Sequence, residues 1–336
     1  MNRRNVLWTG TAALALTVAG LGLGAPALAQ DKMVLKATDV HPLGYPTVEA
    51  VVRLGKKLEA ATNGRLSVQM YPSMQLGGEK EMIEQAQVGA LQFARISVGP
   101  MGSIVDDLNV FNMPFVFRDV PHMKKVIDGA IGDELVKKLT DSQTSKLVGL
   151  AWMDAGARSF YNSKRPIKSI DDLKGLKIRM MGNPIFVDTA NAIGANGIAM
   201  GFDQLINALQ TGVVDGAENN PPSYESGKHY QFAKYYSLSE HLIIPEILVF
   251  SRATWDKLKK EDQALIAKLG KEAQQEERKL WNEREAASMA ELKKQGIEII
   301  TFSPAEKAKF QTAVKPVWDK YGAKYAALVQ RIQDVK

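Results

Sequence analysis

Hydrophobic and polar positions alternate along this 336-residue chain with two periods, which predicts a regular succession of strands and helices. Short apolar or alternating runs, typical of strands, lie at 33–38, 66–70, 91–96, 147–152, 157–161, 176–179, 197–200, 242–244, 248–250 and 297–301. Apolar residues at helical spacing lie between them, at 46–62, from 79 onwards, and at 120–139, 184–193, 202–210 and 262–295. This order predicts an α/β fold with open sheets, in which ligands bind outside the carboxyl ends of the strands.

The helix predicted at 262–295 is far longer than an average domain helix, at about 50 Å for a rise of 1.5 Å per residue. Its apolar positions do not keep a strict heptad, so a brace across two lobes is favoured over a coiled coil. The strands on either side of Pro245 indicate that the chain returns there to its first lobe. We expect the first lobe at 30–155 and 245–283, the second at 156–244 and 284–336, and hinge strands near residues 155 and 245.

Residues 1–29 have the pattern of a cleaved secretory signal peptide. Arg3 and Arg4 precede an apolar run that ends in Ala27-Leu28-Ala29, a typical signal-peptidase site. The arginine pair leaves both the general and the twin-arginine export routes open. We therefore expect the mature protein in the periplasm.

Charge and composition exclude several classes of function. The chain has 43 Lys and Arg against 37 Asp and Glu, a formal net charge of +6, and loss of Arg3 and Arg4 with the signal peptide leaves about +4. The basic residues are spread along the chain, so no nucleic acid partner is expected. The absence of cysteine excludes disulfides, thiol catalysis and cysteine zinc sites. None of the four histidines has metal-ligand spacing, and common hydrolase, metalloprotease and nucleotide-loop motifs are absent, so neither a metal nor a cofactor is expected.

One arginine is well placed to bind a carboxylate. Arg179 ends the strand predicted at 176–179, and the breaker Gly182-Asn183-Pro184 follows it. A guanidinium fixed at a strand end offers the planar, two-point recognition that a carboxylate needs. An ordinary surface arginine on an edge strand is the alternative. Further polar residues at predicted element ends are His41, Glu79, Arg95, Arg158 and Asn219.

Several motifs resemble the solute-binding proteins of TRAP transporters, of the dicarboxylate-receptor type. They are Leu76-Gly77-Gly78-Glu79, the LKIR sequence at 176–179, the ALQTGVVDGAEN sequence at 208–219 and the long helix. The resemblance implies a two-lobed periplasmic binding protein fold with mixed sheets, which closes over an organic acid and delivers it to the membrane subunits of the transporter. It also implies that Arg179 is the main carboxylate clamp, that Arg158 and Asn219 line the pocket, and that Glu79 meets polar groups at the far end of the ligand. We expect a monomer.

Other segments are similar to those of family members that bind hexuronates. They lie at 41–46, 94–97, 179–186 and 218–230. D-Glucuronate and D-galacturonate are therefore the expected ligands, and Asn183, Arg95 and His41 complete the expected ligand-binding set. Glu79 favours the same ligand class, because a carboxylate repels a second ligand carboxylate but accepts hydrogen bonds from sugar hydroxyls. A C4-dicarboxylate or keto acid, an exported enzyme acting on uronic acids, and a ligand sensor for a membrane receptor are the alternatives.

Four of these residues also have a plainer interpretation. Arg158 could support Arg179 without touching the ligand, and Arg95 could simply pair with a nearby acid. His41, beside a proline in a loop, could be a structural donor. Asn219 could be a turn residue before Pro221, although the turn role suits Asn220 better.

Overall fold

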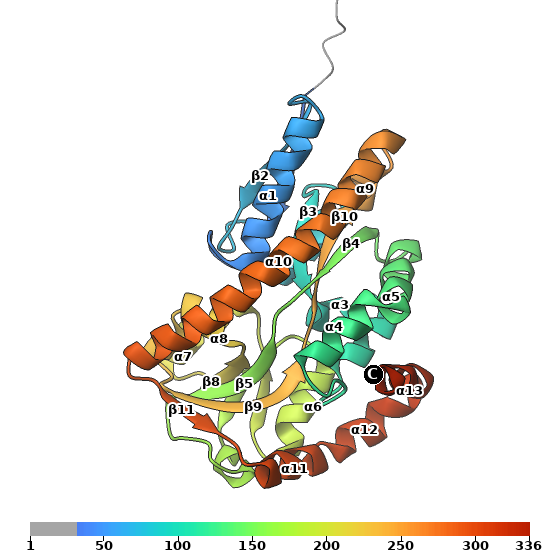
Figure 1. The fold of residues 1–336 in the computed structure, drawn as a ribbon. Helices are drawn as coiled ribbons and strands as arrows, with labels where there is room; N and C mark the ends of the chain where they lie inside the picture. The colour runs from blue at the N-terminus through green and yellow to red at the C-terminus, as the bar shows by residue number, and fades with distance from the viewer. Residues whose placement is uncertain (1–31) are drawn as a thin grey trace, which may run out of the picture. The chain divides into compact units, whose positions relative to one another are not determined.

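The computed structural model describes residues 32–336, so the predicted signal peptide lies outside the described residues. The α/β fold is confirmed, with two mixed sheets (Figure 1). The first sheet has the order β2-β1-β3-β10-β4, with β1 at Met33–Thr38, β2 at Leu66–Tyr71, β3 at Phe93–Ser97, β4 at Leu147–Met153 and β10 at Glu246–Ser251. The second has the order β11-β9-β5-β8-β6-β7, with β5 at Ala157–Asn162, β6 at Lys177–Met180, β7 at Asn196–Ala199, β8 at Gly216–Asn219, β9 at Tyr235–Ile243 and β11 at Glu298–Thr301.

The predicted βαβαβ unit forms the parallel half of the first sheet. β1 pairs in parallel with both β2 and β3, and α1 (Pro46–Ala61) and α2 (Glu79–Gln87) connect them. Pro46 is the first residue of α1, where its missing N–H costs nothing because that group would have no helical partner. β10 runs antiparallel to β3 and β4, which makes the sheet mixed. The carboxyl ends of β1 and β3 thus meet the start of β10 at one edge.

The described chain passes between the two sheets three times. Residues 154–156 join β4 to β5, residues 244–245 join β9 to β10, and a longer stretch at 252–297 joins β10 to β11. In the second sheet, β5 lies between β8 and β9, and β6 pairs in parallel with both β7 and β8. The start of β5 and the carboxyl ends of β6 and β8 therefore lie close together. The helices that follow in this half are α6 (Pro184–Ala192), α7 (Phe202–Thr211) and α8 (Pro221–Ser226).

The long helix α10 covers Lys260–Lys294 and contacts elements of both sheets (Figure 1). Ile266 packs in an apolar cluster with residues of β1, β4 and α1, whereas Leu292 packs with residues of α7 and β9. Between them, Trp281 packs against Tyr45 beside the crossing at residues 154–156. Burial at both ends explains why so long a helix is stable without a heptad partner.

The structure corrects one predicted helix. The region 120–139 forms two helices, α4 (Val120–Asp128) and α5 (Ala130–Asp141), that meet at Gly129, whose backbone is extended at φ −96° and ψ −170°. The apolar spacing runs on through both, which made them look continuous. Three C-terminal helices follow β11: α11 (Pro304–Ala313), α12 (Lys315–Tyr321) and α13 (Ala326–Asp334). Ser303 caps α11, and its hydroxyl accepts a hydrogen bond from Glu306 N at 3.2 Å.

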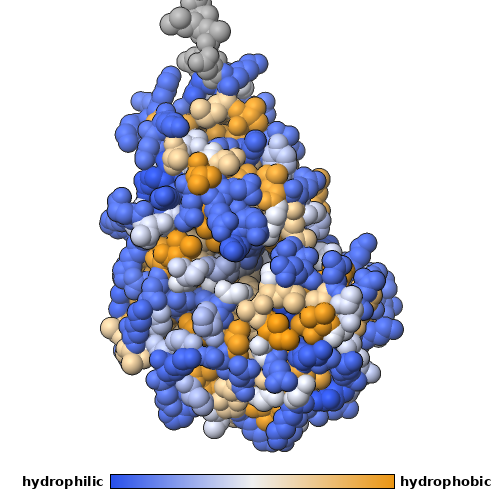
Figure 2. Space-filling view, turned by 180° about the vertical axis from the view of Figure 1, so that it is seen from behind, coloured by the Kyte–Doolittle hydropathy of each residue, from blue (hydrophilic) through white to orange (hydrophobic). Residues whose placement is uncertain are grey.

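The surface is largely hydrophilic on the side opposite to the view of Figure 1 (Figure 2). Large apolar side chains that are exposed among the described residues are Met33 and Val34 at the start of β1, and Leu43, Val88 and Val213 in turns and bends elsewhere. Scattered exposed apolar residues are normal for a folded protein. Within residues 32–336, no helix combines the length and the apolar character needed to cross a membrane.

Gly156, at the first crossing, should not tolerate a side chain. Its φ is +57°, and an added Cβ would lie 2.9 Å from Glu285 Oε1 and 3.2 Å from Trp281. We expect Gly156→Ala to lower the free energy of unfolding by about 1–3 kcal/mol, because both the backbone and the contact would be strained. Urea unfolding measures this. Gly182→Ala is the control, since a Cβ there meets nothing within 4 Å; equal losses in both variants would contradict the prediction.

Candidate ligand-binding site

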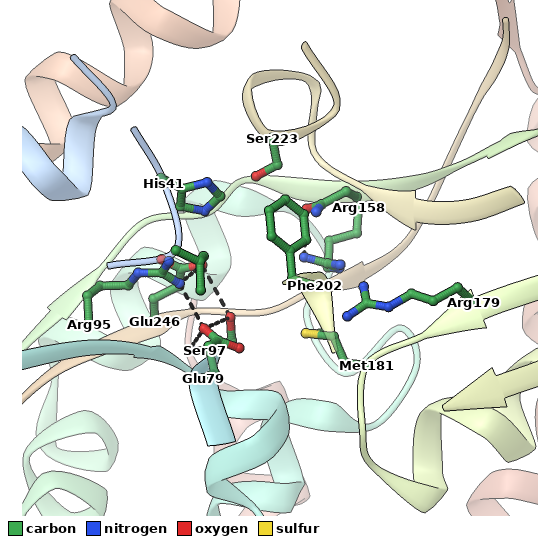
Figure 3. Close-up of a pocket in the computed structure, with 12 residues that line it drawn as sticks. His41, Glu79, Arg95, Ser97, Arg158, Arg179, Met181, Phe202, Ser223 and Glu246 are labelled. Atoms are coloured by element: carbon green, nitrogen blue, oxygen red, sulfur yellow. Dashed lines mark hydrogen bonds and ion pairs between the residues drawn. The ribbon is translucent and has the colours of Figure 1, made fainter. Parts of the chain in front are cut away.

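A small cavity lies where the strand ends of the two sheets meet (Figure 3). Arg95, Glu79 and Glu246 approach from one side, and Arg158 and Arg179 from the other. The lining residues are Val40, His41, Glu79, Arg95, Ser97, Arg158, Arg179, Met181, Phe202, Asn219, Ser223 and Glu246.

Arg95, on β3, is surrounded by acids. Its Nη2 lies 2.5 Å from Asp39 Oδ1, and its Nη1 lies 3.0 Å from both Glu79 Oε1 and Glu246 Oε1. Burial raises the pKa of Asp39, but the charge of Arg95 and the other nearby groups, with the hydrogen bonds from Arg95 and Thr47, together outweigh it and the pKa is lowered. Arg95 therefore pairs with acids, and it also lines the cavity.

Glu79 is the first residue of α2 and has a fixed orientation. Its Oε1 accepts hydrogen bonds from the Ser97 backbone N at 2.8 Å and the Ser97 hydroxyl at 2.9 Å, in addition to Arg95. Its other carboxylate oxygen, Oε2, makes no hydrogen bond within residues 32–336. An oriented carboxylate with a free oxygen is an acceptor for hydroxyl groups.

Arg158, on β5, donates hydrogen bonds to its neighbours on β8. It donates to Glu218 Oε2 at 2.5 Å and Oε1 at 2.9 Å, to Glu218 O at 2.9 Å, and to Asn219 Oδ1 at 2.8 Å. Asn219 Oδ1 also accepts from Asn220 N, which leaves the Asn219 amide nitrogen as the group that can donate into the cavity. Arg158 thus orients Asn219 and neutralises the buried Glu218. It makes no hydrogen bond to Arg179.

Arg179, at the end of β6, is different from the other two arginines. It is 2 % exposed, its Nε donates to Met200 O at 2.7 Å, and its Nη1 is buried without a partner. Within residues 32–336 it has no ion pair, and burial lowers its pKa. A buried guanidinium without an anion is unfavourable by itself, so the site is incomplete without a negatively charged ligand.

His41 lies over the cavity in a stack of rings. Its ring is stacked on Tyr45 at 3.7 Å between centroids, and Phe202 meets it edge-on at 5.6 Å. Burial and the Arg95 charge lower the pKa of His41 to about 3, so the ring is neutral. Its Nδ1 is buried without a partner. His41 is thus held in place by packing, and neither of its ring nitrogens has a hydrogen-bond partner within residues 32–336.

Comparisons with known proteins identify the fold family. Residues 37–324 match the family described as bacterial extracellular solute-binding protein, family 7. The chain belongs to this family. This membership confirms the resemblance to TRAP solute-binding proteins and the two-lobed fold.

Solved structures and a curated relative agree with this assignment. A TRAP periplasmic solute-binding protein from Pseudomonas putida F1 with bound D-glucuronate is 53% identical, with a TM-score of 0.88 over 90% of this chain and 98% of that one. One from Bradyrhizobium in complex with α/β-D-galacturonate is 46% identical, with a TM-score of 0.86 over 90% and 100%. A solute-binding protein from Chromohalobacter salexigens is 37% identical over 298 residues, 89% of this chain and 87% of its relative.

Asn183 is the one expected site residue of this family 7 protein that does not line the cavity. Its Oδ1 caps α6 by accepting from Ile185 N at 3.0 Å, and its Nδ2 donates to Gly99 O and Asn109 Oδ1, both at 2.9 Å. Because these partners use both ends of the amide, Asn183 joins segments of the two halves and is left out of the ligand set. Asn220 caps α8 in the same way, as its expected turn role suggested.

Other lining residues of the family 7 protein were missed by sequence reasoning. Glu246 begins β10 directly after Pro245, and Ser97 ends β3 two residues after Arg95. Both are polar residues at strand ends, so the reasoning that selected the other site residues could also have found them. Ser223 follows the double proline of α8, and its hydroxyl lies 2.8 Å from Tyr45 OH. Nothing in the local pattern indicates that contact, because the two residues are distant in sequence.

Proposed function

We propose that this protein is the periplasmic receptor of a TRAP transporter and that it captures D-glucuronate or D-galacturonate. The observation that carries the proposal is the buried Arg179, which has no acid partner within residues 32–336. A ligand carboxylate would supply the missing charge, and the Asn219 amide would donate to the same group. The relatives from Pseudomonas putida and Bradyrhizobium, which hold such sugar acids, support this ligand class.

The opposite side of the cavity favours hydroxyls over a second carboxylate. Glu79 and Asp39 place negative charge there, and only Arg95 opposes it. A C4-dicarboxylate would bring its second negative charge against these acids, whereas sugar hydroxyls would donate to Glu79 and meet the free nitrogen of His41. A hexuronate has one carboxylate and several hydroxyls, so it matches both sides.

Capture would use closure of two lobes about the crossings at residues 154–156 and 244–245. We retain the lobes 30–155 with 245–283 and 156–244 with 284–336. Cavity residues come from both, with Arg95, Glu79 and His41 on the first and Arg158, Arg179 and Asn219 on the second. Closure around the ligand would also form the surface that the membrane subunits of the transporter recognise.

Calorimetry on the mature protein tests the ligand class. We expect D-glucuronate and D-galacturonate to bind with micromolar or lower Kd, about −8 kcal/mol or better. For a ligand of about 13 heavy atoms this is an ordinary efficiency. Succinate and pyruvate should bind at least tenfold more weakly, because they cannot satisfy both sides of the cavity. Tight succinate binding without heat from either hexuronate would overturn the proposal. Release of free sugar on incubation with a uronide would favour an enzyme instead.

A further inference from the structure

Three carboxylates share one guanidinium on the first side of the cavity. Asp39, Glu79 and Glu246 all lie within 3.0 Å of Arg95, and Glu79 Oε1 and Glu246 Oε1 contact the same nitrogen, Nη1. Arg95 is 1 % exposed, so little solvent screens the three acids from one another. One positive charge cannot balance three neighbouring negative charges in a buried site, so one of the acids should hold a proton.

Two of the acids are well stabilised as anions. Besides Arg95, Asp39 accepts hydrogen bonds from the Thr47 hydroxyl at 2.6 Å and the His41 backbone N at 2.9 Å. Glu79 accepts two hydrogen bonds from Ser97, as described above. Hydrogen bonds donated to a carboxylate favour its charged form. Asp39 therefore has little tendency to take the proton, and one carboxylate oxygen of Glu79 is already supplied with donors.

Glu246 lacks such support. Its Oε1 contacts Arg95 and lies 3.4 Å from the Ser97 hydroxyl, a long hydrogen bond. Its Oε2 is buried without any partner, although the side chain lines the cavity and the residue is 4 % exposed. An unpartnered carboxylate oxygen in a buried site is costly, whereas a protonated one gains a donor that a ligand can use.

The wider surroundings of Glu246 also favour the neutral acid. Burial raises its pKa to about 8, and the charges of Glu79 and Asp39 add to this against the opposing charges of Arg95 and Arg158. Further titratable groups facing it are Tyr45, which directly precedes α1, the neutral His41, and Glu277 of α10, whose pKa burial raises well above its usual value. None of these adds a positive charge on the side of Oε2.

We propose that Glu246 is a protonated carboxylic acid in the ligand-binding form and that it donates this proton in a hydrogen bond to a hydroxyl or ring oxygen of the bound sugar acid. The proposal deepens the proposed function and rests on it, since both concern one cavity. Glu79 then acts as an acceptor and Glu246 as a donor, and together they recognise the polyhydroxylated end of the ligand. No bond other than the hydrogen bond forms.

The consequence is a linkage between binding and pH. Below the pKa of Glu246 the proton is already present, and binding leaves it in place. At higher pH the free protein has lost this proton and must take one from solvent on binding, so the affinity falls. For a pKa of about 8, Kd should rise roughly tenfold between pH 7 and pH 9.

Calorimetry with D-glucuronate between pH 6.5 and 9.5, in pairs of buffers that differ in ionisation enthalpy, tests the linkage on the intact mature protein. We expect the roughly tenfold loss of affinity and an uptake of roughly one proton per ligand at pH 9. Glu246→Gln keeps an uncharged donor but cannot titrate, so its Kd should change less than about twofold over the same range. Thermal unfolding at each pH verifies that the proteins remain folded.

Glu285→Gln is the matched control, because burial also raises the pKa of Glu285 although it does not line the cavity. This variant should keep the wild-type pH dependence. A wild-type Kd that stays constant to pH 9 without proton uptake would overturn the role of Glu246 and leave the proposed function standing. A wild-type protein that binds no hexuronate at pH 6.5 would instead overturn the proposed function. A Glu246→Gln variant with the wild-type pH dependence would assign the proton to another group.

Discussion

Replacement of Arg179 with methionine should weaken binding of D-glucuronate by roughly 30-fold to several thousand-fold. Loss of one partner of a buried, hydrogen-bonded charge pair costs about 2–5 kcal/mol. Arg179 is the buried arginine that lacks an acid partner among residues 32–336, so the ligand carboxylate would be its only counter-charge. Calorimetry at pH 7 measures the effect.

The same variant should hardly change the stability of the unliganded protein. Methionine removes an uncompensated buried charge and keeps an apolar chain of similar length, while the hydrogen bond to Met200 O is lost. We expect the free energy of unfolding to fall by less than about 1 kcal/mol, or to rise. Arg331→Met, at an exposed arginine of α13 that pairs with Glu134 at 2.8 Å, is the binding control. Near-native affinity of Arg179→Met, or an equal loss in Arg331→Met, would refute the clamp.

Replacement of Arg158 with methionine should destabilise the unliganded protein severely, in contrast to the replacement of Arg179. Arg158 satisfies both carboxylate oxygens of Glu218, which is fully buried, and orients Asn219. Removal of one partner of a buried ion pair costs about 3–5 kcal/mol, because the other charge stays uncompensated. We expect this loss in urea unfolding of the unliganded protein.

The double variant Arg158→Met, Glu218→Gln provides the matched test. Since it removes the charge that the single variant leaves behind, it should recover at least half of the lost stability. A double variant as unstable as the single one would show that packing of the Arg158 side chain, and not its charge, is what matters. The contrast with Arg179→Met tests whether two buried arginines on neighbouring elements have different tasks, one structural and one for the ligand.

Hydrophobic periodicity and the positions of prolines predicted several strands and helices correctly. The strands at 33–38 and 66–70, the helix from Pro46 and the helix at 184–193 lie where their periodicity and prolines indicated. The prediction at 120–139 was wrong, because apolar periodicity continues across Gly129 while the backbone there is extended. Only residues 242–244, at the end of β9, were expected as a strand, whereas β9 covers Tyr235–Ile243.

Seven residues were expected in the site from the sequence alone, and six of them line the cavity. Polar residues at strand ends gather at one edge of a sheet, because strand direction and connection order fix where those ends lie. Asn183, which the resemblance and not this rule placed in the site, does not line the cavity, because the residue before Pro184 caps α6. Resemblance to known receptors supplied the ligand class that the rule by itself could not give.

Only the tertiary structure decided what each charged residue does in that cavity. Arg95, Arg158 and Arg179 all lie near strand ends, yet one is shared by three acids, one is paired with Glu218, and one has no acid partner within residues 32–336. Glu246, at the start of a strand far along the chain, drew no attention until its position beside Arg95 was known. Electrostatic roles depend on distances of a few ångströms between segments remote in sequence, and local patterns carry no information about those distances.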